Sequence, residues 1–275
     1  KPRACILILA RNSDLHGVLS SVGQLERRFN AAPHARYPYC YLNDRPFSLK
    51  FRAAVTAATA APCFFGLVPQ EHWSYPPHIN VSRAAELRQA ARRRMPYGGS
   101  ESYRFMCRYF SGFFFDHPLL EGFDWYWRVE PDVHFMCNLP GRERDPFRHM
   151  QASNQSLAWT IVMDEVPSTI PSLWPEVQQW LADNPQHATQ QQRQRVLASP
   201  YGRSRFTGCH FWSNFEVGRL SFFRSKAYRS FFAHLDAGTG FFYERWGDAP
   251  VHTLAAAALL HRDQIHFARD IGYKH

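Results

Sequence analysis

Two carboxylates separated by one residue lie where an apolar segment ends. The aromatic run of residues 123–129 stops at Glu130-Pro131-Asp132, and a second apolar run follows. Pro131 lacks a backbone N–H and has a fixed φ, so we do not expect a central strand to continue through it. Ligands of open α/β sheets bind at the carboxyl ends of the strands. With Arg128 beside them, the two acids indicate either a divalent-cation site for a phosphorylated ligand or a turn with solvated acids.

A second group of reactive side chains occupies residues 209–216, which read Cys-His-Phe-Trp-Ser-Asn-Phe-Glu. The segment ends on Glu216, which lies among aromatic residues. A carboxylate in that setting suits a nucleophile or an acid/base group. A plain ion pair between Glu216 and the nearby Arg219 is the alternative.

A third group lies in residues 238–252, where glycines bracket packed aromatic residues. Charged residues, Asp248 and Arg245 among them, are interspersed there. Charged side chains are rarely buried without a partner or a role. Asp248 therefore either takes part in a site or forms an ion pair with Arg245.

The elements that would position these residues alternate between strand and helix in the first part of the chain. Short apolar runs predict strands at residues 6–10, 37–42 and 63–68, and apolar spacing predicts helices at residues 15–29 and 47–60. This order is typical of a doubly wound α/β sheet. Arg11, at the first strand-to-helix turn, either meets a diphosphate there or belongs to an ordinary loop. Neither standard glycine-rich phosphate loop is present.

The second part of the chain is less regular. An aromatic helix is expected at residues 101–115, where Tyr103 and Arg104 could reach a ligand. Further predicted elements are strands at residues 157–163 and 265–267 and helices at residues 82–94, 172–181, 220–235 and 254–260. Residues 189–204 are polar and read as a flexible insertion or an exposed helix. No linker divides the sequence, so we expect one domain over residues 1–275, with a nucleotide-binding part at 1–135 and an acceptor and catalytic part at 136–275.

The charge balance allows an anionic partner. The 275 residues carry a formal net charge of +9 with a pI of about 9.4, and 45% are hydrophobic, enough for a sizeable core. Part of the excess lies in Arg92-Arg93-Arg94. A charge run is usually a solvated face, and no nucleic-acid-binding motif accompanies it. We therefore expect no nucleic-acid partner.

The cysteines and sequons hint at a secretory compartment. None of the six cysteines forms a C-x-x-C pair, which gives no support to a zinc or redox motif. Their even number and the sequons at Asn80 and Asn154 are compatible with the secretory lumen. No run of 18 apolar residues and no signal peptide is visible, and we expect a trimmed catalytic domain.

Five stretches resemble the fungal Golgi α-1,2-mannosyltransferase family. They are residues 97–104, 125–132, 209–216, 242–252 and 270–273, and the resemblance runs from about residue 6 to residue 275. It implies a single-domain GT-A fold, Rossmann-like, with a mixed central sheet flanked by helices. It also implies retaining transfer of mannose from GDP-mannose to a mannose-containing glycan or glycoprotein in cell wall mannan synthesis, a Mn²⁺ ion, and a Golgi type II membrane protein whose anchor lies outside this sequence. Residues 186–206 depart from the family.

The resemblance also implies roles for individual residues. Glu130 and the terminal His275 would hold Mn²⁺, with Asp132 a weaker candidate, while Arg11, Arg128 and Tyr103 would contact the nucleotide. Glu216 resembles the family's candidate nucleophile, Tyr103 an active-site tyrosine, and Asp248 a residue that orients or deprotonates the acceptor hydroxyl. Retention then proceeds either by double displacement through a carboxylate or by front-face attack.

Two other interpretations remain open. One is a mannosylphosphate transferase, which would release GMP, or a mannosyltransferase that forms another linkage, which the linkage of the product would reveal. The other is a non-catalytic mannan-binding module that has kept the fold, which Glu130, Glu216, Asp248 and His275 argue against.

Overall fold

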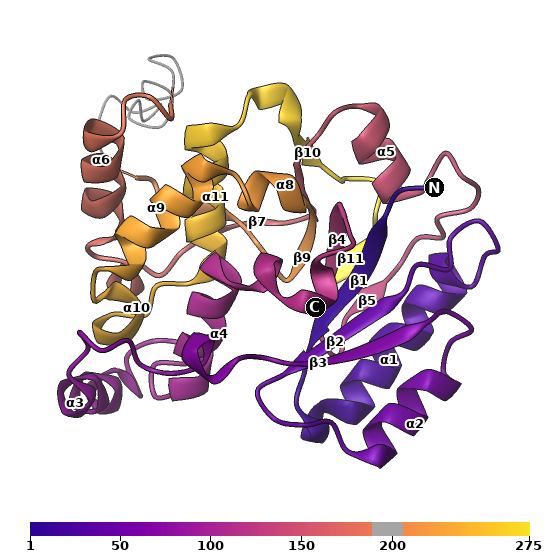
Figure 1. Ribbon diagram of the computed structural model, residues 1–275, viewed down its shortest axis with the longest axis horizontal. Helices are drawn as coiled ribbons and strands as arrows, with labels where there is room; N and C mark the ends of the chain where they lie inside the picture. Colours follow the sequence, from indigo (N-terminus) through magenta and orange to yellow (C-terminus); the bar gives the residue numbers. More distant parts are fainter. Residues whose placement is uncertain (189–205) are drawn as a thin grey trace.

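The computed structural model describes residues 1–188 and 206–275. Its centre is a seven-stranded sheet with the order β10-β6-β9-β4-β1-β2-β3 (Figure 1). In chain order the strands are β1 (Ala4–Leu9), β2 (Tyr39–Asn43), β3 (Cys63–Leu67), β4 (Trp125–Val129), β6 (Leu157–Trp159), β9 (Phe215–Arg219) and β10 (Ile265–Phe267). Two small sheets pair β5 (His134–Phe135) with β11 (Tyr273–Lys274) and β7 (Val162–Asp164) with β8 (Cys209–Phe211).

The central sheet is mixed. Strand β1 runs parallel to β2 and β4, and β2 runs parallel to β3. Strand β9 is antiparallel to both of its neighbours, β4 and β6. The prediction of an α/β fold with a mixed central sheet is therefore confirmed, with β9 joining the regular N-terminal half to the rest.

Helices cover both faces of the sheet. The longer helices are α1 (Leu15–Leu25), α2 (Leu49–Ala57), α3 (Val81–Ala91), α4 (Glu101–Gly112), α6 (Leu173–Asp183), α9 (Lys226–Asp236) and α11 (Asp248–Leu259), with shorter α5 (Pro146–Ala152), α8 (Leu220–Phe223) and α10 (Gly240–Tyr243). Side chains of a strand alternate between faces. On β4, Trp125 and Trp127 join the core beneath α1 and α2, whereas Tyr126 joins the core formed with α4, α9 and α11.

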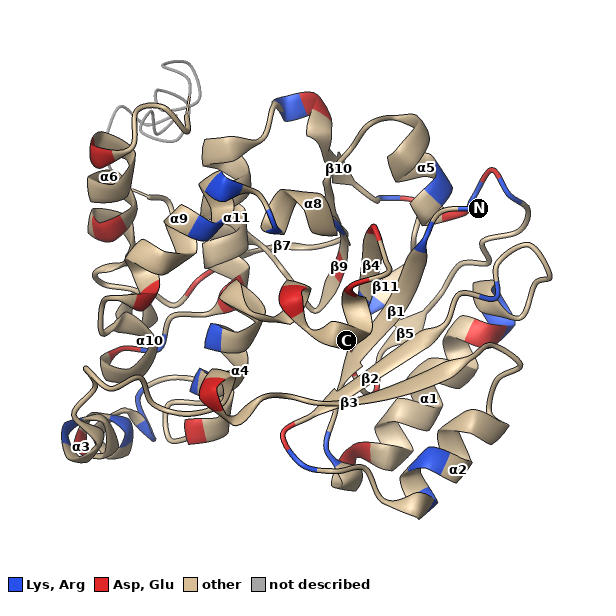
Figure 2. Cartoon of the chain, viewed as in Figure 1, with Lys and Arg blue, Asp and Glu red and all other residues tan. Residues whose placement is uncertain are grey.

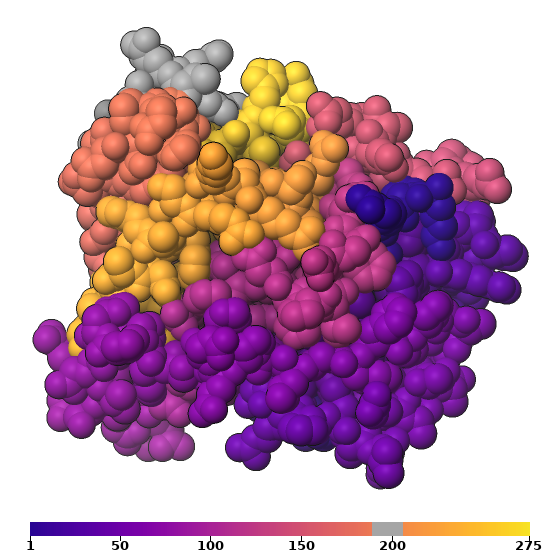
Figure 3. Space-filling model, viewed as in Figure 1, coloured from indigo at the N-terminus to yellow at the C-terminus, as the bar shows by residue number. Residues whose placement is uncertain are grey.

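The two parts of the chain pack against each other along this sheet. Figure 3 shows the N-terminal residues in purple over the lower part of the molecule and the C-terminal residues in orange and yellow above them, with magenta residues between. The basic segment is exposed: residues 92–94 follow α3, whose arginines appear blue in Figure 2. The exposure of residues 92–94 agrees with the expectation that this run of arginines is a solvated face.

Several predicted elements differ from those observed. Residues 157–163 form two strands in different sheets, β6 and β7, not one. Residues 220–235 form two helices, because Ser225 caps α9 and ends the preceding turn. The alanine-rich helix expected from residue 254 begins six residues earlier, at Asp248, and β11 was not expected at all. The insertion predicted at residues 189–204 lies outside the described residues.

The cysteines and the helices bear on the expected compartment. All six cysteines are free in the structure, and Cys5, Cys40 and Cys107 are buried. The expectation of a secretory lumen therefore gains no support from disulfides. In residues 1–188 and 206–275 no helix has the length and apolar character needed to cross a membrane.

Candidate active site

A pocket of about 270 Å³ lies at the carboxyl ends of β1 and β2. Arg11, which follows β1, and Asn43 and Asp44, at the end of β2, line it. Arg11 donates from Nη2 to the Ser102 hydroxyl at 2.7 Å, which ties the first strand-to-helix turn to the start of α4. The pocket therefore lies at the sheet edge where α/β proteins bind nucleotides.

Two stacked tyrosines line the same pocket. The ring centroids of Tyr97 and Tyr103 are 4.5 Å apart and their planes differ by 6°. Tyr97 has a φ of +56° and is 63% exposed. The neighbouring Cys107 and burial raise the pKa of Tyr103, so its hydroxyl keeps its proton. Arg104 does not reach the pocket, because it is buried and its guanidinium donates to backbone carbonyl groups.

Arg128 lies buried on β4 between two carboxylates. Its Nε donates to Oε1 of Glu130 at 2.6 Å, and its Nη1 donates to Oδ2 of Asp248 at 2.5 Å. The guanidinium also lies 3.7 Å from the centroid of the Phe110 ring. Burial opposes its charge, but Glu130, Asp248 and Glu216 together raise the pKa of Arg128. Arg128 therefore stays charged and links Glu130 to Asp248.

Asp248 faces Arg128 from the first turn of α11. The Ser213 hydroxyl donates to the same oxygen, Oδ2, at 2.7 Å. Burial would raise the pKa of Asp248, but Arg128 and other neighbours lower it, so the carboxyl is ionised. The alternative ion pair with Arg245 is wrong, because Arg245 pairs with Glu165 at 3.1 Å.

Glu216 is a buried carboxylate with a hydrogen-bond partner on each oxygen. The Tyr126 hydroxyl donates to Oε1, and Nδ1 of His252 lies 2.8 Å from Oε2. The other ring nitrogen of His252 lies 2.9 Å from the Phe110 carbonyl oxygen. Both of these partners are acceptors, which favours the charged imidazolium. The alternative ion pair with Arg219 is wrong, because Arg219 donates to an asparagine side chain.

The pKa of His252 agrees with that assignment. Burial lowers the pKa of His252, but the charge and hydrogen bond of Glu216 outweigh it and raise the pKa above the ordinary value. Glu216 and His252 therefore form a buried ion pair in which each charge stabilises the other. Such pairs are sensitive to the loss of either member.

The two predicted metal ligands come from distant parts of the chain. Pairing of β11 with β5 brings His275 close to the segment that follows Glu130. Nδ1 of His275 lies 3.1 Å from the side-chain nitrogen of Asn214, and the Tyr273 hydroxyl donates to the Asn214 carbonyl. Burial, and next the charge of Glu130, raise the pKa of Tyr273. Glu130 and His275 therefore both lie around Tyr273.

Glu130 and His275 can hold a divalent ion only if a bound ligand and water supply its other ligands. Within the described ranges no three His, Cys, Asp or Glu side chains are grouped to hold an ion. The described neighbours of Glu130 engage only Oε1, so its other oxygen can coordinate. Coordination through Nε2 of His275 requires Nδ1 to donate, which a 180° rotation of the Asn214 amide permits by placing its oxygen where the nitrogen now lies. One carboxylate and one imidazole fit a Mn²⁺ ion that takes its other ligands from phosphate and water.

Asp132 has a different environment from Glu130. Its φ is +61°, and its backbone N–H donates to the Gly17 carbonyl at 3.0 Å. A Cβ atom at Gly17 would lie 2.6 Å from Oδ2 of Asp132, so the carboxylate packs directly on α1. Asp132 thus braces the loop against that helix. The ranking of Glu130 above Asp132 as a ligand stays a prediction.

The predicted residues form two adjoining groups. Arg11 and Tyr103 line the pocket, and a second group comprises the buried Arg128, Glu216 and Asp248 with the partly exposed Glu130. Met106 joins the groups, because it lines the pocket and its sulfur lies 3.8 Å from Nη2 of Arg128. His275 approaches from β11. The arrangement can bind a phosphorylated ligand beside buried, fixed charges of both signs.

Sequence reasoning missed several contributors, although signals for them existed. Asn43 and Asp44 end a strand parallel to the one before Arg11, so they share its sheet edge. Tyr126 is two residues from Arg128 on one strand and therefore on the same face. His252 lies four residues after Asp248, on the same face of α11, but that relation was hidden while the helix was expected to start at residue 254.

The chain resembles known proteins over its whole length. Residues 1–275 match a family model described as glycolipid 2-alpha-mannosyltransferase. A glycolipid 2-alpha-mannosyltransferase of Saccharomyces cerevisiae is 47% identical over 275 residues, which are 100% of this chain and 61% of the relative. An O-glycoside alpha-1,2-mannosyltransferase of Schizosaccharomyces pombe is 42% identical over 273 residues, 99% of this chain and 68% of the relative.

Two solved structures also match this chain over its whole length. Core-mannan synthase A from Aspergillus fumigatus, in its Mn/GDP form, has a TM-score of 0.93 at 39% identity, covering 100% of this chain and 75% of that one. The mannosyltransferase Ktr4p from S. cerevisiae in complex with GDP has a TM-score of 0.91 at 32% identity, covering 100% and 71%. The chain spans about six tenths of the length of the first curated relatives it matches.

Proposed function

The chain belongs to the glycolipid 2-alpha-mannosyltransferase family, and on that premise we propose that it is a retaining α-1,2-mannosyltransferase. Its donor is GDP-mannose, and its acceptor is a hydroxyl of a mannose-terminated glycan. The observation that carries the proposal is the position of Arg128, which joins Glu130 to Asp248 beside the pocket at the ends of β1 and β2. Arg128 thereby ties Glu130, just after β4, to Asp248 at the start of α11.

The donor occupies the pocket that Arg11 and Tyr103 line. Arg11 lies at its mouth, where a guanidinium can pair with a diphosphate. Glu130 and His275 hold Mn²⁺, in keeping with the Mn/GDP form of a solved relative. When bound, that ion supplies positive charge against the departing diphosphate. Arg128 adds a second, permanent positive charge to the same region.

Asp248 orients the acceptor hydroxyl. Both of its hydrogen bonds end on Oδ2, so Oδ1 has no hydrogen-bonding partner among the described residues. The lowered pKa makes Asp248 a weak base. Its contribution is therefore to hold the hydroxyl in place and to accept its proton only as the new bond forms. Tyr103, still protonated, donates to the donor phosphate or the reacting sugar.

Glu216 acts as a fixed negative charge. A nucleophile must present an oxygen to the anomeric carbon, but Tyr126 and His252 occupy both oxygens and the residue is 3% exposed. That arrangement favours front-face attack over double displacement. A fixed carboxylate beside the site also stabilises the positive charge that develops on the sugar ring.

The family also supports a proposal for the cellular setting. We place the protein in the Golgi lumen, as a type II membrane protein that builds cell wall mannan, with its anchor outside residues 1–275. The greater length of the relatives is compatible with such a segment. Residues 1–275 act as one catalytic domain, because the central sheet takes strands from both the 1–135 and the 136–275 parts.

The test is turnover of GDP-mannose with Mn²⁺ and α-methyl mannoside as acceptor. We expect GDP and an α-1,2-linked dimannoside whose anomeric configuration matches that of the donor. GMP as product would mean mannosylphosphate transfer, and another linkage would change the specificity assigned here. If the protein bound mannan without any turnover, it would be a mannan-binding module and not an enzyme.

A further inference from the structure

A second pocket lies behind the sheet, away from the candidate active site. Its volume is about 300 Å³, at the lower end of the range for small-molecule sites, about 300–1,000 Å³. Ala158, Val217 and Met150 form its apolar floor. Ala158 and Val217 are partners on β6 and β9, and Val217 points to the face opposite its neighbour Glu216. The pocket is therefore separated from the active site by the thickness of the sheet.

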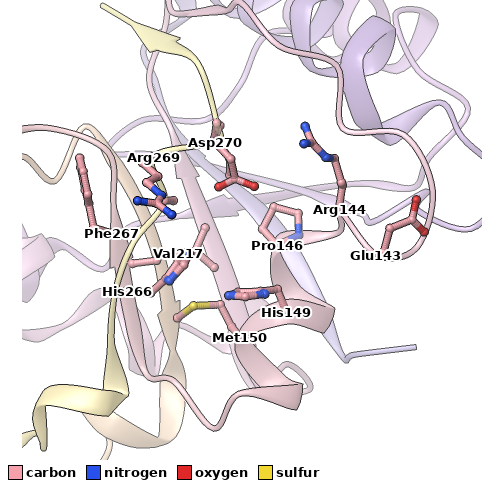
Figure 4. A pocket seen from close by; sticks show the side chains of 13 residues that line it. Glu143, Arg144, Pro146, His149, Met150, Val217, His266, Phe267, Arg269 and Asp270 are labelled. Atoms are coloured by element: carbon pink, nitrogen blue, oxygen red, sulfur yellow. The ribbon is translucent and has the colours of Figure 1, made fainter.

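Polar side chains of both signs surround this floor. Figure 4 shows the Asp270 carboxylate and the rings of His149 and His266 facing the same space, with Arg144 and Glu143 farther out on the loop. The two histidine rings have centroids 4.6 Å apart. Arg269 completes the rim.

The four charged side chains of this rim have no hydrogen-bonding partner among the described residues, and the charge of Asp270 acts on His266 only through space. In the part of the chain that the structure describes, the charged groups of Glu143, Arg144, Arg269 and Asp270 form no ion pair or side-chain hydrogen bond. Elsewhere on the surface comparable groups do pair, as Arg229 does with Asp116. Unpaired donors and acceptors around an apolar floor are what a ligand with both polar and apolar faces requires.

The charges select a neutral ligand over an anion. Two arginines balance two acids on the rim. Burial, and next the charge of His149, lower the pKa of His266, so His266 offers one donor and one acceptor. Vicinal sugar hydroxyls pair well with carboxylate, guanidinium and imidazole groups, and the C–H face of a sugar packs on an apolar floor such as that of Ala158, Val217 and Met150.

The pocket is connected to the active site through one short segment. Asp270 and Ile271 form one wall, and the chain continues through β11 to His275. Those five residues span at most about 18 Å when extended. His275 therefore lies no more than about 18 Å from the pocket wall, and a glycan that reaches both sites passes around the sheet along this segment.

We propose that this pocket is a second carbohydrate site, which binds an unphosphorylated mannose unit of an extended glycan away from its reacting end. This inference rests on the proposed function for the identity of the sugar. It assigns to Arg269, His149 and His266 a role in holding long acceptors. The proposal predicts that this pocket lets the enzyme distinguish long glycans from short ones, although the pocket takes no part in the reaction.

The test uses the whole chain and exposed residues, so that folding is preserved. Arg269→Ala and His149→Ala are compared with Arg262→Ala, an exposed arginine outside the pocket. With a long α-1,2-mannan oligosaccharide as acceptor, we expect KM to rise about three- to tenfold in the two pocket variants, the effect of one lost hydrogen bond. With α-methyl mannoside, kcat and KM should match the wild-type values in all three variants.

Direct binding separates this proposal from the catalytic one. Adding α-1,2-mannotriose to the GDP- and Mn²⁺-saturated protein should shift the NMR signals of the His149 and His266 rings, and maltotriose should not. Equal KM values for the long acceptor in the pocket and control variants, or histidine shifts with inorganic phosphate alone, would overturn the second site. Normal turnover of α-methyl mannoside in that case would leave the proposed function intact. Mannotriose binding without any turnover would instead contradict the catalytic proposal alone.

Discussion

The ring of Tyr126 fills the space in which a side chain at Gly218 would lie. The two residues are direct partners on β4 and β9, and a Cβ atom at position 218 would come within 2.5 Å of the ring. The missing side chain lets the Tyr126 hydroxyl reach Glu216, two residues away on β9. A glycine thus shapes the candidate active site without contacting any substrate.

Gly218→Ala should lower both stability and transfer activity. The tyrosine ring is fully buried, so it cannot move aside freely, and overpacking of this kind costs about 1–3 kcal/mol. Displacement of the ring also removes a donor from Glu216. Thermal unfolding and kcat report the two effects. Gly122→Ala is the control, because nothing lies within 4 Å of its added Cβ, and wild-type behaviour of both variants would contradict the prediction.

Glu130→Ala and His275→Ala should each weaken Mn²⁺-dependent GDP binding by about tenfold or more, equivalent to about 1.4 kcal/mol. Each change removes one of two protein ligands from the proposed shared site. Calorimetric titration of GDP with and without Mn²⁺ measures the effect. Asp132→Asn is the matched control and should retain the metal dependence, since Asp132 packs on α1. Unchanged metal dependence in both alanine variants refutes the ligands.

Glu216→Gln should abolish transfer while leaving GDP affinity nearly unchanged. An amide keeps the size of the carboxylate but removes the charge that His252 pairs with, and one of its ends becomes a donor facing another donor. We expect kcat to fall about 10²–10³-fold, as when one electrostatic group is lost from an active site. Wild-type turnover in this variant would remove Glu216 from the mechanism.

The raised pKa of His252 predicts a pH-dependent contribution to stability. Burial acts against the charged ring but Glu216 outweighs it, so the folded protein binds this proton more tightly than the unfolded chain does. The contribution is complete below the unfolded value of about 6.5 and is lost as pH rises through the raised pKa.

The measurement is the difference in the free energy of unfolding between the wild type and His252→Gln, taken from about pH 6 upward. That difference should shrink as pH rises. His261→Gln, at an exposed position, should show no comparable trend. A wild-type advantage that stays constant across the range would contradict a charged His252.

The sequence predicted the parts of this protein that depend on local signals. Apolar runs located β1, β3 and β4, and Pro131 located the end of the aromatic strand beside Glu130. Local patterns did not reveal which strands pair. The insertion of β9 against β4, which makes Arg128 and Glu216 direct partners, depends on contacts between residues far apart in the chain.

The sequence predicted which residues belong to the candidate site better than it predicted which of them contact one another. Arg128, Glu130 and Asp248 were each chosen, but as separate features, because nothing local shows that one guanidinium contacts both acids. Arg245 and Arg219 were considered as partners since they are near in sequence. The observed partners lie much farther away along the chain, 120 residues for Asp248, so proximity in sequence favoured the wrong ones.

The antiparallel strand β9 sets the order in which the molecule can assemble. Strands β1 to β4 pair within the first part of the chain, because β4 lies beside β1, whereas the other edge of β4 needs β9, whose Glu216 lies 90 residues after Tyr126. Pairing over such separations slows folding. During synthesis the nucleotide pocket can form while the acceptor side has not yet left the ribosome, because chains fold from the N-terminus as they are made. Arg11 and Tyr103 would then be in place before Glu216, Asp248 and His275 have been made.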